Sequence, residues 1–108
     1  MSLKPTPEQV GDAKARHGGR LYQLSAAEGE VHVIVRPPER MLWNKVKAMY
    51  LDDRRRKDAN EALVRGCLVW PDEAGFNGVM EEYPAAIEAL AKALSDIAGA
   101  GDVEKKAL

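Results

Sequence analysis

Two apolar helical segments on either side of a proline, in the stretch from Asn60 to Tyr83, constrain this fold more than any other sequence feature. Four apolar residues in the first segment share the spacing of one helical face: Leu63, Val64, Cys67 and Leu68. Pro71 interrupts the helix, because the residue before a proline is disfavoured in the α-helical region. Asp72 is then the predicted N-cap of a second helix. Its apolar residues are Phe76, Val79 and Met80.

Two β-rich runs, residues 20–24 and 31–35, predict a β-hairpin because a short segment containing Gly29 separates them. Alternation in the second run places Val31, Val33 and Val35 on one face, which we expect to point into the core. Two consecutive prolines then end the strand. An isolated hairpin is marginally stable in water, so we expect it to pack against helices. One edge of the hairpin would remain exposed as a candidate assembly surface.

Two more helices complete the prediction. The first runs from Pro38 to about Asp52, with a flank of Trp43 and Tyr50 beside a buried stripe of Leu42, Val46 and Met49. The second runs from Ala85 to about Ala98 and has the clearest amphipathic pattern in the chain, before Gly99 and Gly101 end it. The sequence therefore predicts an α+β fold, with one β-hairpin packed against three to four amphipathic helices.

The 108 residues fit one domain with short flanking segments. We expect residues 1–19 to form an N-terminal arm, in which Thr6 caps a short helix that Gly18 and Gly19 end. This arm is either a loosely docked helix or a mobile segment. Residues 20–99 are the predicted α+β domain, and residues 100–108 the predicted flexible tail.

Composition and charge restrict the class of protein. The chain has one cysteine, so no internal disulfide and no cysteine-based metal cluster is expected. It shows no apolar run of about 18 residues and no secretory signal, which favours a cytoplasmic protein without a membrane span. The net charge of -1 hides an asymmetry, since residues 1–70 carry 13 basic and 9 acidic side chains and residues 71–108 carry 3 and 8. Such polarity can steer a partner or a second copy.

No catalytic, cofactor or metal site is predicted. His17 and His32 lie on separate elements, and neither has a second ligand at helical spacing, so a structural role is favoured for both. Cys67 lies among aliphatic residues and is expected to be an inert, buried thiol. A small enzyme whose site assembles from distant residues stays an alternative, which would need a deep polar pocket containing His17 or His32 with a carboxylate partner.

The basic run from Arg54 to Lys57 allows two interpretations. Four consecutive cations can bind phosphates, and they lie between two predicted helices, as in DNA-binding domains. Three acidic residues flank the run, however, and no aromatic residue interleaves with it. A solvated or partner-facing turn is therefore favoured over nucleic-acid binding. The candidate partner-binding residues are the large aromatic and basic side chains in and around these helices: Trp43, Tyr50, Arg54, Arg55, Arg56, Trp70 and Phe76.

The order of elements resembles that of a viral protein family. It combines the hairpin, the Pro37-Pro38-Glu39-Arg40 junction, a helix, the segment from Asn60 to Asp72, the Tyr83-Pro84 break and a last helix that ends in glycine. This pattern, over roughly residues 20–99, is similar to small proteins from the tail-morphogenesis regions of tailed bacteriophages and prophages. They are often described as tail assembly chaperones or tail-associated proteins.

The resemblance implies a non-enzymatic protein that keeps apolar or coiled-coil-prone segments of the tail tape-measure protein soluble while the tail tube assembles. The expected partner is therefore another protein, for example the tape-measure protein, or a second copy in a homo-oligomer. The implied location is the cytoplasm of a bacterial host or the virion. No site residues follow from the resemblance, because its pattern marks packing positions. The alternative function is a nucleic-acid-associated regulator that uses residues 54–57.

Overall fold

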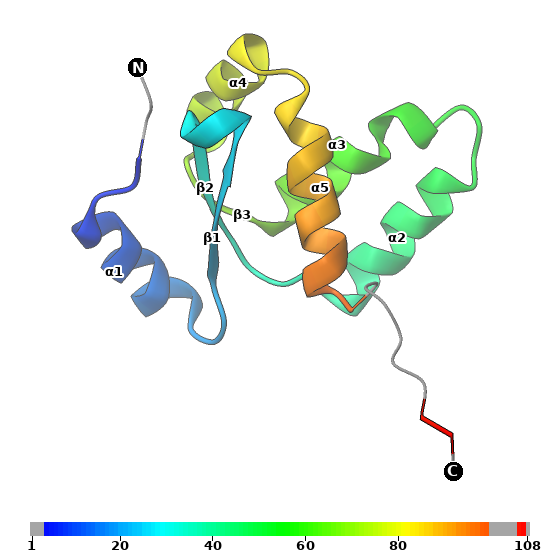
Figure 1. Cartoon of the computed structure of the whole chain (residues 1–108), viewed down its shortest axis with the longest axis horizontal. Coiled ribbons are helices and arrows are strands. Elements are labelled where there is room, and N and C mark those ends of the chain that lie inside the picture. The colour runs from blue at the N-terminus through cyan, green and yellow to red at the C-terminus, as the bar shows by residue number, and fades with distance from the viewer. Residues whose placement is uncertain (1–3, 100–105, 108) are drawn as a thin grey trace.

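The computed structural model describes residues 4–99, 106 and 107, and within these residues the chain forms five α-helices and one three-stranded antiparallel sheet. The strands are β1 (Tyr22–Ala26), β2 (Val31–Val35) and β3 (Leu68–Trp70), in the order β1-β2-β3. The helices are α1 (Pro7–His17), α2 (Arg40–Tyr50), α3 (Arg56–Cys67), α4 (Glu73–Glu82) and α5 (Ala86–Ile97). The predicted α+β class is confirmed (Figure 1).

The third strand is a feature that the sequence prediction missed. Leu68 was assigned to a helical face, but α3 ends at Cys67 and Leu68 has an extended backbone. The N–H of Arg36 donates to the carbonyl of Cys67 at 2.9 Å, and β3 then pairs with β2 through an irregular register. Val69 and Trp70 favour extended structure, and the following proline disfavours helix at Trp70. The end of α3 therefore extends the hairpin into a sheet.

The inner face of the sheet forms the core. Val31, Val33 and Val35 are buried on this face, as the alternation predicted. Their partners on β1 are Ala26, Leu24 and Tyr22, which pack against the same core cluster. Helix α3 lies between α2 and α5 and contributes three of the most deeply buried side chains: Leu63, Val64 and Cys67. The core therefore lies between the sheet and these helices.

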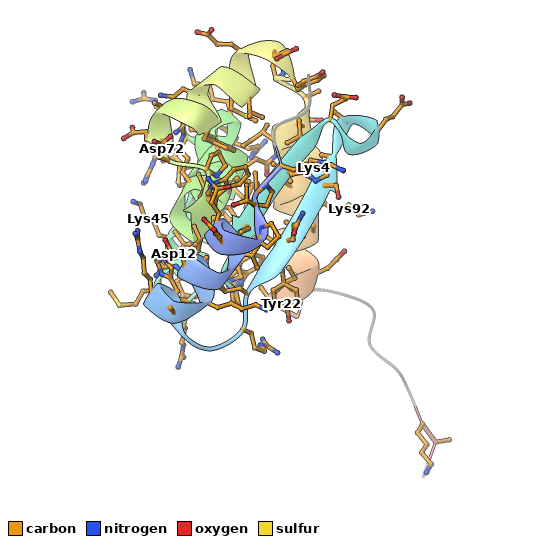
Figure 2. All side chains as sticks on the ribbon, turned by 90° about the vertical axis from the view of Figure 1, so that its left-hand side faces the viewer. Lys4, Asp12, Tyr22, Lys45, Asp72 and Lys92 are labelled. Atoms are coloured by element: carbon orange, nitrogen blue, oxygen red, sulfur yellow. The ribbon has the colours of Figure 1, made fainter. Side chains whose placement is uncertain are left out.

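Helix α1 covers the opposite face of the sheet (Figures 1 and 2). A capping box starts it, because the Thr6 hydroxyl accepts from the Gln9 N–H at 3.2 Å and the Gln9 side chain accepts from the Thr6 N–H at 2.8 Å. Ala13 is its buried residue, and Ile34 is buried on the strand that faces it. The N-terminal arm therefore forms a docked helix, and Gly18 and Gly19, both with positive φ, follow it.

The Leu42 side chain of α2 packs directly on Gly66 near the end of α3. A Cβ atom at Gly66 would lie 2.6 Å from the Cδ2 atom of Leu42, which is closer than real Cβ contacts. The Leu42 side chain therefore occupies the space that a side chain at position 66 would need. Gly99 has a φ of 97° and ends α5, as predicted. The predicted tail lies mostly outside the described residues, at 100–105 and 108.

A matched pair of leucine substitutions tests this core. Leu94 is completely buried, whereas Leu51 is 77% exposed. We expect Leu94→Ala to lower the free energy of unfolding by about 2–5 kcal/mol, because it removes buried methyl groups and leaves a cavity. Leu51→Ala should change it by less than about 0.5 kcal/mol. Urea denaturation of both variants measures the difference, and similar losses at the two positions would contradict the assigned core.

Candidate binding surface

Two of the predicted partner-binding aromatic residues, Trp43 and Tyr50, lie on the side of α2 that packs toward the core. Both are half-buried against the core cluster. The Tyr50 hydroxyl donates to the side-chain carbonyl of Asn60 on α3, and burial raises the pKa of Tyr50. Their contacts attach α2 to the rest of the domain, which leaves them little surface for a partner.

Phe76 and Trp70, two further residues predicted to bind a partner, differ in how far they are buried. Phe76 is fully buried in the core, so it cannot contact a partner while the domain is folded. The Arg65 guanidinium lies over its ring, 4.9 Å from the ring centroid, and donates to the Asn77 side chain at 2.7 Å. This contact joins α3 to α4. Trp70 is half-buried on β3 and lines a hollow next to α1.

The basic run forms the turn between α2 and α3, and its cations differ in their contacts. Arg56 stabilises the turn itself, because its guanidinium donates to the Asp53 carboxylate at 2.9 Å and to the backbone carbonyl of Tyr50 at 2.9 Å. Arg54 and Arg55 are exposed, and within the described residues neither side chain forms an ion pair. Arg54 and Arg55 are therefore the members of the run that remain accessible to a partner.

The most exposed large apolar side chains lie on the outer face of α2 and at its end. Met41 is 84% exposed and Leu51 is 77% exposed. Together with exposed Asn44 and Ala48 they follow the spacing i, i+3, i+7, i+10, which is the spacing of a coiled-coil seam. We call Met41, Asn44, Ala48 and Leu51 the α2 stripe. Three exposed cations flank it: Arg40, Lys45 and Lys47.

Sequence reasoning missed this stripe, although its signal is present in the sequence. Val46 and Met49 of the predicted stripe are buried in the core, and Leu42 is partly buried against it, which explains the amphipathic pattern of α2. Met41 and Leu51 belong to a second apolar series on a different side of α2. Around the helix axis, this series is rotated from the first by more than about one third of a turn. A search for a second seam on the same helix would have found it.

The two histidines lie in different environments, His17 at the end of α1 and His32 in β2. His17 is exposed and lines a hollow of about 210 Å³ with Asp12 and Arg16, which also pair with each other at 3.8 Å. His32 is buried on the outer face of β2, and neither of its ring nitrogens has a hydrogen-bond partner within residues 4–99, 106 and 107. His17 and Asp12 line the same hollow, but both are exposed and the hollow is open, so it is not the deep polar pocket that the enzymatic alternative needs. His32 does not line this hollow.

The part of the chain that the structure describes contains no group of three histidine, cysteine, aspartate or glutamate side chains arranged to hold a metal ion. Within the same residues, no helix has the length and apolar character needed to cross a membrane.

Cys67 is enclosed at the end of α3. Burial raises the pKa of its thiol from 9.0 to about 11, although the Arg36 guanidinium opposes the rise and the Glu39 carboxylate adds to it. A thiol with this pKa is almost entirely protonated at neutral pH and is a weak nucleophile. The environment of Cys67 therefore agrees with the inert role expected from its apolar neighbours.

The raised thiol pKa predicts a pH dependence of stability. The folded thiol keeps its proton to higher pH than the unfolded thiol, so unfolding releases a proton between about pH 9 and 11. The free energy of unfolding should therefore fall as pH rises through this range. Chemical denaturation from pH 8 to 10.5 should show a steeper fall for the natural chain than for Cys67→Ala, in which the tyrosines still titrate. Equal slopes would contradict the assigned pKa.

Comparison with known proteins gives a fold and no family. No protein-family model matches the chain, and no curated protein matches its sequence. Among solved structures, the chain is similar to an uncharacterised protein, rbstp2171, from Bacillus stearothermophilus, with a TM-score of 0.77 and 19% sequence identity. The similarity covers 91% of this chain and 99% of that chain. At this level of identity it establishes a shared α+β fold alone.

Proposed function

We propose that this protein is a non-enzymatic, chaperone-like assembly protein that binds an amphipathic helical segment of another protein. The observation that carries the proposal is the α2 stripe, where large apolar side chains are exposed at coiled-coil spacing on the outer face of a packed helix. Exposed leucine and methionine in one row offer the contact area that a partner helix buries in helix-in-groove recognition. Methionine also adapts its shape to different apolar partners.

The flanking charges restrict the partner. Residues 40–57 contain seven Lys or Arg residues and two acidic residues. A helix that docks on the α2 stripe would therefore be bound best if its own apolar seam is flanked by Asp and Glu, as in coiled-coil partners with complementary e and g positions. The stripe spans about 15 Å of helix, which corresponds to about three turns of the partner.

The resemblance to phage tail assembly chaperones agrees with this mode of binding. Coiled-coil-prone segments of a tape-measure protein present apolar seams that aggregate unless they are covered. A row of exposed apolar side chains on a folded helix can cover such a seam temporarily, because the contact is small and is released without unfolding the chaperone. We therefore propose a tail tape-measure protein as the partner in a bacteriophage or prophage.

Nucleic-acid binding by residues 54–57 has less support. Helix α3, which follows the basic turn, packs between α2 and α5 and buries its apolar face in the core, so that face is not available to DNA while the domain is folded. Arg56 is also engaged by Asp53 and by the backbone of Tyr50.

A synthetic heptad peptide tests the proposal. We expect a peptide with leucine at the a and d positions and glutamate at the flanks to bind the natural chain, and a peptide with lysine at the flanks to bind more weakly. The double substitution Met41→Asp/Leu51→Asp should weaken binding of the glutamate peptide by at least about tenfold, or about 1.4 kcal/mol. Isothermal titration calorimetry measures both affinities.

The matched control is Ala15→Asp, which adds charge at an exposed position on α1, outside the α2 stripe. It should bind the glutamate peptide like the natural chain. If the Met41→Asp/Leu51→Asp variant binds the glutamate peptide as tightly as the natural chain does, the proposal is wrong. Salt-sensitive binding of duplex DNA in place of the peptide would favour the nucleic-acid alternative.

A further inference from the structure

A second apolar surface lies at the corner where η1, a 3₁₀ turn at Ala27–Gly29, meets the connection between α4 and α5 (Figure 1). It is an open hollow of about 390 Å³. We call it the corner hollow. Its apolar lining comes from Ala27, Tyr83, Pro84, Ala85, Ala86 and Ala89. Since a cavity of about 150 Å³ holds a benzene molecule, the corner hollow has room for large aliphatic side chains.

The charge of the segments that form the corner hollow is predominantly negative. Residues 27–30 and 72–97 contain eight Asp or Glu residues and one basic residue, Lys92, which follows Ala89 on α5. Glu82 lines the hollow, and Glu28 and Glu88 adjoin lining residues in the chain. Partial burial raises the pKa of Tyr83, and the Glu82 and Glu30 carboxylates raise it further. Within the described residues, none of these four glutamates forms an ion pair.

We infer that the corner hollow of one copy binds the α2 stripe of a second copy. The α2 stripe has the complementary properties, since Met41 and Leu51 project from a surface flanked by Arg40, Lys45 and Lys47. Apolar side chains would enter an apolar hollow, and cations would face carboxylates around it. Such charge complementarity favours the encounter and fixes its orientation.

Electrostatics also selects this pairing over the symmetric alternatives. Two α2 stripes facing each other would bring cations against cations, and two corner hollows would bring carboxylates against carboxylates; both arrangements are unfavourable. The α2 stripe and the corner hollow are different surfaces of the same molecule. A contact between them can close as a two-fold dimer, in which each copy uses both surfaces, or it can continue as a ring or an open chain of copies.

The inferred contact is small, so it should be weak and reversible. Both surfaces are short, and contacts that bury less than about 1,200 Å² are typical of transient association. The contact would cover the apolar side chains of the α2 stripe while no partner is present. A partner helix that takes the same stripe would compete with the second copy. The inference goes beyond the proposed function, because self-association does not require that partner.

Charge-swap complementation tests the inference. One variant, Lys45→Glu/Lys47→Glu, reverses charges beside the α2 stripe, and the other, Glu82→Lys/Glu88→Lys, reverses charges at the corner hollow. All four side chains are exposed, so both variants should fold. We expect the natural chain to show a sedimentation coefficient that rises with concentration at low salt and less at about 0.5 M salt. Each variant alone should lose this rise, and an equimolar mixture should regain it.

The matched control reverses two exposed lysines outside both surfaces, Lys4→Glu/Lys14→Glu, and should associate like the natural chain. Circular dichroism verifies the fold of each variant. A natural chain that stays monomeric at all concentrations overturns the inference, as does a mixture of the two variants that fails to regain association. If the glutamate peptide binds while the natural chain stays monomeric, the inference of self-association fails and the proposed function stands. If the natural chain associates but does not bind the peptide, self-association stands and the proposed function fails.

Discussion

Burial of α3 is the constraint on which the rest of this structure depends. Leu63, Val64 and Cys67 are completely buried, with the sheet, α2 and α5 around them. Removing this much apolar surface from water stabilises the domain by several kcal/mol, which is comparable with the net stability of a small protein. Because α3 occupies the centre, α2 has one face packed on it and one face left to solvent. The exposed face of α2 is therefore a consequence of how the core is filled.

Much of the fold could be predicted from the sequence because local signals agreed with the tertiary structure. The valine alternation of β2, the Thr6 capping box and the amphipathic pattern of α5 each specify an element without long-range information. β3 could not be predicted in this way. Three residues give almost no periodic signal, and Leu68 also fits the apolar face of the preceding helix. Only the unpaired edge of β2 decides that these residues form a strand.

The candidate surface was harder to predict than the fold. Large aromatic residues such as Phe76 and Trp43 are used both in cores and in interfaces, so their identity alone does not say which role applies. Exposure separates the two roles, and exposure depends on how α2 and α4 pack. The charge asymmetry, by contrast, was visible in the sequence. The structure adds that exposed cations lie beside the α2 stripe and that glutamates adjoin the apolar lining of the corner hollow.

Helix α1 is expected to detach from the domain at a lower free-energy cost than the core elements. It contacts the sheet on the face opposite the core, and Ala13 is the residue that it buries. Segments with few buried apolar contacts open at a lower free-energy cost than the core. Ile34 is buried on the face of β2 that α1 covers, and the buried imidazole of His32 lies on the same strand, with no partner for its nitrogens within residues 4–99, 106 and 107. Opening of α1 would therefore expose this face of the sheet to water at a lower cost than opening of the core.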